Sequence, residues 1–158
     1  MKVDHLDPDG VLPRARVLIV DDEVRLREGL AGLLRREHSV VSAGSAHEAL
    51  EYLRSGVQFD LILSDVMMPG VSGFDLYELI AREFPSYAHR VVFMTGAVEP
   101  SREQISRLPN ACLGKPLDLG RLRSIIRETV IASTRDFPRV GLSGPARYAA
   151  ATKSAETQ

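Results

Sequence analysis

The sequence predicts an α/β protein in which helices cover both faces of a five-stranded parallel sheet. Short apolar runs rich in β-branched residues alternate along the chain with longer segments whose leucines follow a helical spacing. Strands that alternate with helices form βαβ units, and their crossover connections are right-handed. Acids and a hydroxyl directly follow several of the apolar runs. Because function in such sheets gathers at the carboxyl ends of the strands, we expect a site there.

The elements expected in the first half are a strand, a helix, a strand and a helix: Arg16–Val20, Val24–Glu37, Ser39–Ala43 and Ser45–Arg54. Both strands are short β-branched runs, as buried strands are. The first helix has Leu26, Leu30 and Leu33 at helical spacing, which predicts one apolar face. Ser45 is expected to be the N-cap of the second helix, because Glu48 follows it at the spacing of a capping box.

In the second half, three strands and three helices are expected to alternate: Phe59–Ser64, Gly73–Phe84, Arg90–Met94, Pro100–Leu108, Ala111–Leu113 and Asp118–Ile131. The helix from Gly73 should stop before Pro85, since the residue before a proline avoids the helical conformation. Pro100 suits the first turn of a helix. Asp118 is the expected cap of the last helix.

The composition fits one globular domain and favours a cytoplasmic protein. The chain has 158 residues, and 44% of them are hydrophobic, which is enough for one core. Its net charge of -1 gives no reason to expect nucleic acid or an anionic membrane as a direct partner. A lone cysteine, Cys112, excludes an internal disulfide and fits a reducing compartment. No apolar run has the length of a membrane span, so we expect no membrane insertion.

Three segments are expected along the chain. Residues 1–14 are polar, carry proline and glycine, and are predicted to be a flexible leader. Residues 15–132 hold all the expected strands and helices and are predicted to be the folded domain. Residues 133–158 contain few large apolar side chains, which predicts a disordered tail too short for a second domain.

Five side chains at the predicted strand ends carry the chemistry: Asp21, Asp22, Asp65, Thr95 and Lys115. Like charges at contact distance raise each other's pKa or require a cation. Mg²⁺ suits a site with one or two carboxylates, waters and phosphate oxygens. A carboxylate can also be a covalent phosphoryl acceptor, because phosphoryl transfer depends mainly on positioning and charge neutralisation.

Four motifs in register resemble those of the receiver domains of two-component response regulators: Val20–Glu23, Ser64–Pro69 with Gly73, Met94–Gly96, and Lys115–Pro116. The resemblance covers about residues 15–131. It implies a doubly wound sheet with the flavodoxin-like strand order 2-1-3-4-5. One such motif alone would carry little weight, whereas four in the right order make a chance match improbable.

The resemblance also implies a role for each residue of the site. Asp65 would be the phosphoacceptor, and Thr95 and Lys115 would contact the phosphoryl group. Mg²⁺ (or Mn²⁺) would be bound by Asp22 directly, by Asp21 beside it acting through water, by Asp65, and by the backbone carbonyl of Met67. The Lys115–Pro116 bond would be cis, which proline permits at low cost.

The partners implied are a sensor histidine kinase or a histidine phosphotransfer protein, together with an unknown output protein. The chain would be a single-domain regulator or the receiver of a hybrid histidine kinase, and a homodimer is left open. It would not be an enzyme, beyond Mg²⁺-dependent self-phosphorylation and slow autodephosphorylation.

Two departures from the family pattern stand out. Cys112 occupies the switch position, three residues before the lysine, where receivers usually carry an aromatic residue that moves with the threonine. Met67 and Ala97 stand at positions that influence how water reaches the aspartyl phosphate, and neither side chain hydrogen-bonds water strongly. We therefore expect slow loss of the phosphoryl group.

Two other classes of function fit the sequence less well. A haloacid-dehalogenase-like phosphatase also uses an aspartate with Mg²⁺, but its nucleophile follows the first strand in an Asp-x-Asp pattern, whereas Asp21 and Asp22 are adjacent here. A flavodoxin-like binding module needs phosphate-cradling groups after the first strand, where these acids would repel phosphate.

Overall fold

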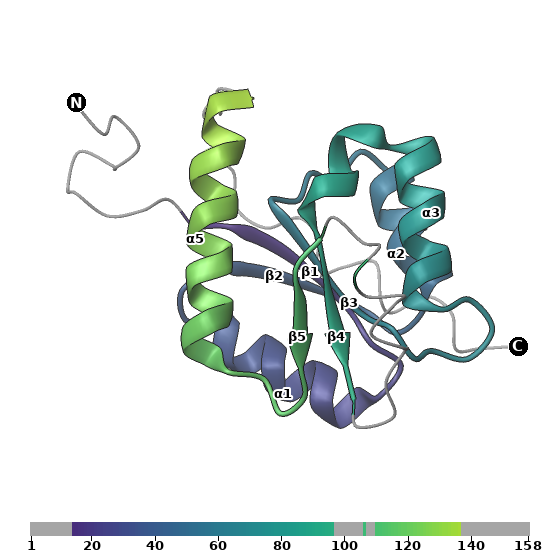
Figure 1. Ribbon diagram of the computed structural model, residues 1–158, viewed down its shortest axis with the longest axis horizontal. Helices are drawn as coiled ribbons and strands as arrows, with labels where there is room; N and C mark the ends of the chain where they lie inside the picture. Colours follow the sequence, from purple (N-terminus) through teal and green to yellow (C-terminus); the bar gives the residue numbers. More distant parts are fainter. Residues whose placement is uncertain (1–13, 97–105, 107–109, 137–158) are drawn as a thin grey trace, which may run out of the picture.

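Five parallel strands form the centre of the fold (Figure 1). The structure is a computed structural model that describes residues 14–96, 106 and 110–136. All strand pairs are parallel, and the order in the sheet is β2-β1-β3-β4-β5, as the resemblance implied. The strands are β1 (Arg16–Val20), β2 (Ser39–Ala43), β3 (Leu61–Asp65), β4 (Val91–Thr95) and β5 (Cys112–Gly114).

Helices cover both faces of the sheet (Figure 1). They are α1 (Val24–Leu34), α2 (Ala46–Arg54), α3 (Gly73–Glu83), the 3₁₀ helix η1 (Pro85–Arg90) and α5 (Leu119–Asp136). The helices α1 and α5 pack in one apolar cluster, and α2 and α3 pack in a second. Alternate residues of β1 enter the two clusters: Val17 and Ile19 face the first, Leu18 and Val20 the second. This is the pattern of a sheet buried on both faces.

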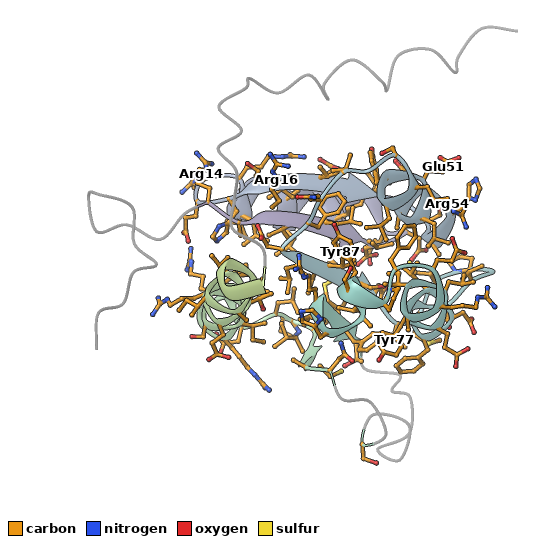
Figure 2. All side chains as sticks on the ribbon, turned by 90° about the horizontal axis from the view of Figure 1, so that it is seen from above. Arg14, Arg16, Glu51, Arg54, Tyr77 and Tyr87 are labelled. Atoms are coloured by element: carbon orange, nitrogen blue, oxygen red, sulfur yellow. The ribbon has the colours of Figure 1, made fainter. Side chains whose placement is uncertain are left out.

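An ion pair joins the C-terminal ends of α2 and α3. Arg54 donates two nitrogens to Glu83, at 3.1 Å from Nε and 2.9 Å from the terminal nitrogen. Figure 2 shows Arg54 and Glu51 at the outer surface of α2, away from the sheet. The site at the carboxyl ends of the strands therefore does not involve this pair.

The predicted strands β1 and β2 are confirmed with their bounds, but the later three are displaced toward the C-terminus. Asp65, Thr95 and Gly114 are the last residues of β3, β4 and β5, whereas each predicted strand ended one residue earlier. The ladder explains the difference, because Asp65 pairs with Met94 and Thr95 pairs with Gly114. Apolar runs marked the strands, but backbone pairing extends them into the polar site residues.

Helix bounds differ from the predictions at several ends. The first helix ends at Leu34 rather than Glu37, and the last continues to Asp136 rather than stopping at Ile131. The predicted helix Pro100–Leu108 lies outside the described residues, except for Ser106, which is helical. The predicted leader lies outside them except for Arg14. The predicted tail began at residue 133, but residues 133–136 belong to α5, and the rest of the tail lies outside the described residues.

Caps were predicted at two helices, and a complete reciprocal box is found at a third. Asp118 caps α5 as predicted, accepting the Arg121 N–H at 3.1 Å. Ser45 caps α2, accepting a bond from the Glu48 N–H at 3.2 Å, but the Glu48 carboxylate accepts from Gly44 at 2.7 Å rather than from Ser45. The reciprocal box lies at α3, where Ser72 and Asp75 bond each other's backbone N–H. The sequence pattern of a capping box has Glu or Gln at the third helical position. Asp75 stands there in α3, so the pattern did not predict this box.

Two features of the periphery were not predicted. The 3₁₀ turn of η1 follows Pro85, which the sequence indicated only as a stop. His38 is half-buried, and its Nδ1 accepts the Ala15 N–H at 3.3 Å. Among the described residues, no helix combines the length and apolar character that crossing a membrane requires.

Candidate functional site

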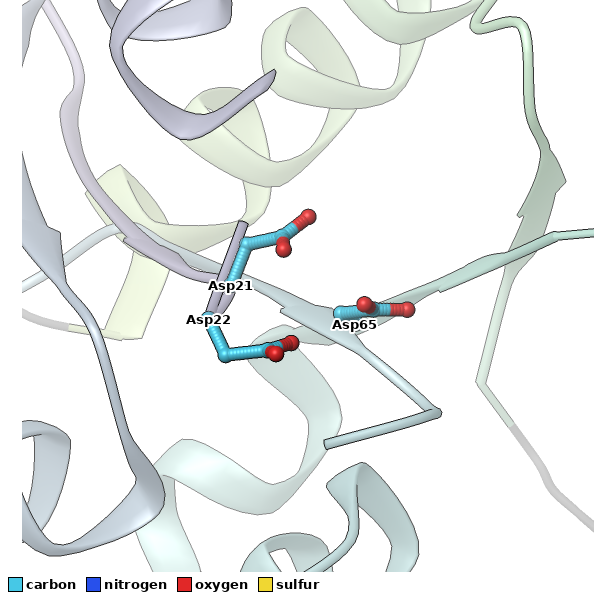
Figure 3. A group of neighbouring side chains, drawn as sticks. All are labelled: Asp21, Asp22 and Asp65. Carbon is cyan, nitrogen blue, oxygen red and sulfur yellow. The ribbon is translucent and has the colours of Figure 1, made fainter. Parts of the chain in front are cut away.

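Three carboxylates meet at the carboxyl edge of the sheet (Figure 3). Asp21 and Asp22 follow β1, and Asp65 ends β3, the neighbouring strand. One carboxylate oxygen from each lies within 4.8 Å of the other two. Asp21 and Asp65 are buried, whereas Asp22 is exposed. The site therefore has a buried floor and one acid at its open side.

Asp21 is held by bonds to both carboxylate oxygens and to its backbone. Its Oδ1 accepts the N–H of Glu23 at 2.9 Å, and its Oδ2 accepts Lys115 Nζ at 3.1 Å. Its own N–H donates to the carbonyl of Ala43, at the end of β2, at 3.1 Å. These bonds satisfy a carboxylate that is 0% exposed and would otherwise be costly to bury.

Lys115 joins the two buried acids. Its Nζ lies 3.1 Å from Asp21 Oδ2 and 3.2 Å from Asp65 Oδ2. The other oxygen of Asp65, Oδ1, accepts the N–H of Met67 at 3.3 Å. Asp65 thus has a cation on one side and a backbone donor on the other.

The charges of the site oppose one another. Burial raises the pKa of Asp65, and the neighbouring Asp21 charge adds to this, while Lys115 acts in the opposite direction. Burial would lower the pKa of Lys115, but its bonds to Asp21 and Asp65 outweigh this and raise it. Lys115 is therefore fixed in its charged form, and Asp65 is an acid whose ionisation depends on nearby cations.

The loop from β3 to α3 is closed by Gly73. Its N–H donates to the carbonyl of Val66 at 2.9 Å. A Cβ at this position would collide with the backbone carbonyl of Asp65 and lie 2.9 Å from Val66 Cα, so only glycine permits this approach. The start of α3 is thereby pressed against the backbone of Asp65.

The side chains of Thr95 and Cys112 lie near each other on the neighbouring strands β4 and β5. Thr95 is the last residue of β4 and is buried. The Cys112 thiol lies 3.9 Å from the Thr95 hydroxyl oxygen, close enough for a weak bond. Cys112 is half-buried and packs against the same apolar cluster as Phe93. The thiol thus fills part of the space beside Thr95.

Lys115 directly follows β5, and its backbone still bonds to β4. The Lys115 N–H donates to the Thr95 carbonyl at 2.7 Å. The following Lys115–Pro116 peptide bond is cis.

The oxygen donors of this cluster suit a hard divalent cation. Carboxylates from Asp21, Asp22 and Asp65 converge, and hard cations prefer oxygen ligands. Lys115 supplies only one positive charge against these three acids. A small dication would balance the remaining negative charge, so the residues present fit such an ion.

The family of the chain follows from a match to the model of the response regulator receiver domain over residues 17–127. The chain belongs to this family. Receiver domains are the modules of two-component response regulators, so the fold and the class of function inferred from the sequence are confirmed.

Several curated proteins are similar to the chain over most of its length. The response regulator protein PilR of Pseudomonas aeruginosa is 34% identical over 73% of the chain, which covers 26% of PilR. Protein PetR of Rhodobacter capsulatus is 34% identical over 84% of the chain and 56% of PetR. The sensor histidine kinase AruS of P. aeruginosa is 33% identical over 77% of the chain and 12% of AruS. The chain therefore spans little more than half of PetR and much less of the other two.

Solved structures agree with the fold. A response regulator receiver protein from Pseudomonas putida has a TM-score of 0.64 and 30% identity, covering 75% of this chain and 99% of that one. A receiver domain protein from Clostridium thermocellum has a TM-score of 0.68 at 24% identity, covering 78% of this chain and 99% of that one. The second match, at this identity, supports the fold alone.

The structure brings the predicted site residues to one edge of the sheet. Asp21, Asp65 and Lys115 are in direct contact, Asp22 joins the acidic group, and Thr95 ends the next strand. Sequence reasoning missed a further residue: the guanidinium of Arg27, on α1, donates to the Asp21 carbonyl at 2.7 Å. The only signal in the sequence was its position, about one and a half helical turns after the acid pair, and this spacing alone did not indicate a contact with Asp21.

Proposed function

We propose that the chain accepts a phosphoryl group on Asp65 from a phosphohistidine of a sensor histidine kinase or a histidine phosphotransfer protein. The observation that carries this proposal is the position of Asp65 at the end of β3, with the Lys115 ammonium 3.2 Å from its Oδ2. Two further acids converge on the same point. A carboxylate so placed can be a covalent acceptor.

In the proposed transfer, one oxygen of the ionised Asp65 attacks the phosphorus. The phosphorus–nitrogen bond of the phosphohistidine breaks, and the imidazole leaves with the electron pair. Lys115 lies close enough to Asp65 to pair with an oxygen of the arriving group. Burial raises the pKa of Asp65 and so favours its neutral form. The cations around it would oppose this effect and keep Asp65 in the ionised form that attack requires.

We infer that Mg²⁺ (or Mn²⁺) is held directly by Asp22 and Asp65, with the backbone carbonyl of Met67 as the third protein ligand and Asp21 beside the ion. When bound, such an ion neutralises phosphoryl oxygens and orients them for in-line displacement. Asp22 is the exposed acid, so we expect the donor protein to approach from its side. The Asp21 carboxylate is already bonded to Lys115 and Glu23, which favours contact with the ion through water.

Thr95 and Cys112 form the proposed switch. The Thr95 hydroxyl would turn toward the phosphoryl group, leaving the Cys112 thiol that now lies 3.9 Å away. A thiol is too small to repeat the large movement of an aromatic ring. We therefore propose that the phosphorylated state is read from the site loops rather than from a ring between β4 and β5.

The phosphorylated state is proposed to persist. Met67, two residues after Asp65, is 59% exposed, and its thioether cannot hold an attacking water firmly. The other position expected to matter, Ala97, lies outside the described residues. Self-catalysed dephosphorylation would then be the only reaction of the chain besides its own phosphorylation, and it would be slow.

The wider setting is also a proposal. The chain would serve as a single-domain regulator or as the receiver of a hybrid histidine kinase, acting on an output protein rather than on nucleic acid. The sensor histidine kinase AruS, which the chain resembles over 77% of its length, favours the hybrid setting. The cytoplasmic location, the division into leader, domain and tail, and dimerisation stay predictions.

Incubation with acetyl phosphate and Mg²⁺, followed by intact-mass measurement, tests the proposal. The wild type should gain one phosphoryl group, and Asp65→Asn should gain none. Asp118→Asn, which alters an exposed acid at the start of α5, is the matched control and should react like the wild type. Equal labelling of wild type and Asp65→Asn would contradict the proposal, and sustained turnover of a phosphate ester would instead indicate a phosphatase.

A further inference from the structure

The turn that carries Asp21 and Asp22 is tied to α1 by Arg27. One terminal nitrogen of Arg27 donates to the backbone carbonyl of Asp21 at 2.7 Å. The Arg27 side chain is only 15% exposed, and its Nε lies 3.7 Å from Glu28. It is therefore a largely buried guanidinium directed at a backbone group rather than at solvent.

The position of Arg27 also depends on the connection between β2 and α2. A Cβ at Gly44 would lie 3.2 Å from the Arg27 terminal nitrogen and 3.7 Å from its central carbon. The guanidinium thus lies against the backbone of Gly44, whose N–H is itself bonded to Glu48 at 2.7 Å. Three segments meet at this side chain: the turn after β1, α1, and the start of α2.

The contact between Arg27 and the Asp21 carbonyl matters most for the orientation of the Asp22 carboxylate. Among the described residues, its carboxylate has no hydrogen bond or ion pair, so its direction depends on its backbone. The Asp21 carbonyl belongs to the peptide unit that joins Asp21 to Asp22, and fixing that carbonyl fixes the plane from which Asp22 extends. Asp21, by contrast, is also held through its N–H and both carboxylate oxygens.

We propose that Arg27 is a positioning residue for the cation site: it fixes the Asp21–Asp22 peptide so that the Asp22 carboxylate points at the bound ion. The inference rests on the proposed function, since it assigns Asp22 as an Mg²⁺ ligand. Partners that orient metal ligands typically contribute tenfold to hundredfold to metal affinity. An alternative role, in which Arg27 acts only through its charge, predicts the opposite effect, because removing a cation near the acids would tighten cation binding.

The test compares Arg27→Ala and Arg27→Lys with Arg25→Ala, an exposed arginine of the same helix. Mg²⁺ affinity is measured by calorimetry on the unphosphorylated protein. Arg27→Ala should bind Mg²⁺ about tenfold more weakly. Arg27→Lys, which keeps a donor, should recover part of the affinity, and Arg25→Ala should match the wild type. With acetyl phosphate, Arg27→Ala should need more Mg²⁺ for half-maximal labelling but reach the wild-type rate at saturation.

A metal-free measurement separates this inference from the proposed function. Without Mg²⁺, the amide of Glu23, which bonds Asp21 Oδ1, should exchange its hydrogen faster in Arg27→Ala than in the wild type or in Arg25→Ala. Unchanged exchange with unchanged Mg²⁺ affinity, or tighter Mg²⁺ binding, would overturn the role of Arg27. If the wild type binds no Mg²⁺ at all, the proposed function fails, and faster exchange would still support the role of Arg27 in holding the turn.

Discussion

Gly73→Ala offers a sharp test of how the acceptor loop is held. The new Cβ would collide with the carbonyl of Asp65 and lie 2.9 Å from Val66 Cα. Both neighbours are backbone atoms at the end of a central strand, so they cannot rotate away as a side chain can. Overpacking of this kind costs about 1–3 kcal/mol, and the rigid neighbours place the expected loss near the middle of that range, at about 2 kcal/mol.

A matched control comes from Gly29, an exposed glycine within α1. A Cβ there would meet nothing within 4 Å. Gly29→Ala should therefore stabilise the fold by about 0.5–1 kcal/mol, because alanine favours the helix over glycine. The two substitutions add the same methyl group and should change stability in opposite directions.

Urea denaturation followed by circular dichroism gives both free energies of unfolding. Labelling by acetyl phosphate should also be slower in Gly73→Ala, since relief of the collision moves the backbone of Asp65. Gly73→Ala with wild-type stability and wild-type labelling would refute the idea that α3 is pressed against the acceptor strand. A loss of stability in Gly29→Ala would show that the space around an added Cβ does not predict the change in stability.

Three further predictions concern the core, the pH response and the phosphate lifetime. Phe93 is 0% exposed, and its ring meets Phe74 edge-on at 5.2 Å, so Phe93→Ala should cost about 3–5 kcal/mol in urea denaturation; a loss under 1 kcal/mol would contradict the packing. Burial lowers the pKa of His38 from its usual 6.5, so the fold favours neutral imidazole. The neutral His38 stabilises the fold fully above the pKa of the unfolded chain, and this stability is lost as pH falls toward the lower pKa of the folded protein. The midpoint of thermal unfolding should therefore vary less with pH below about 6.5 in His38→Gln than in the wild type. Equal pH slopes in the two proteins would refute the role of His38. Met67→Asn should speed loss of the phosphoryl group, followed by intact mass after removal of acetyl phosphate; fast decay in the wild type, unchanged by the substitution, would contradict a role for Met67.

The strands and the site were predictable for the same reason. Apolar β-branched runs such as Arg16–Val20 mark buried strands directly, and the acids at their ends fall together because parallel strands end at one edge. The ends of β3 and β4 were misplaced by one residue, since Asp65 and Thr95 belong to the ladder although they are polar. Composition indicates burial, but it does not record backbone pairing.

The contacts that the sequence did not reveal run from side chains to backbone groups. The Glu48 carboxylate bonds Gly44 instead of completing the box at Ser45, because Gly44 lies within its reach. Arg27 contacts Asp21 and lies against Gly44 only because α1 folds back over the ends of β1 and β2. Helical periodicity placed Arg27 on α1 but could not indicate which backbone group its guanidinium would meet.

The most direct test of the account is to map the phosphorylated residue. After incubation with acetyl phosphate and Mg²⁺, borohydride reduction converts an aspartyl phosphate to homoserine, which peptide mass spectrometry locates. The account predicts conversion at Asp65 alone, with Asp21 and Asp22 unchanged. Conversion at either of those acids, or none in a protein that remains folded, would contradict the assignment of Asp65 as the acceptor.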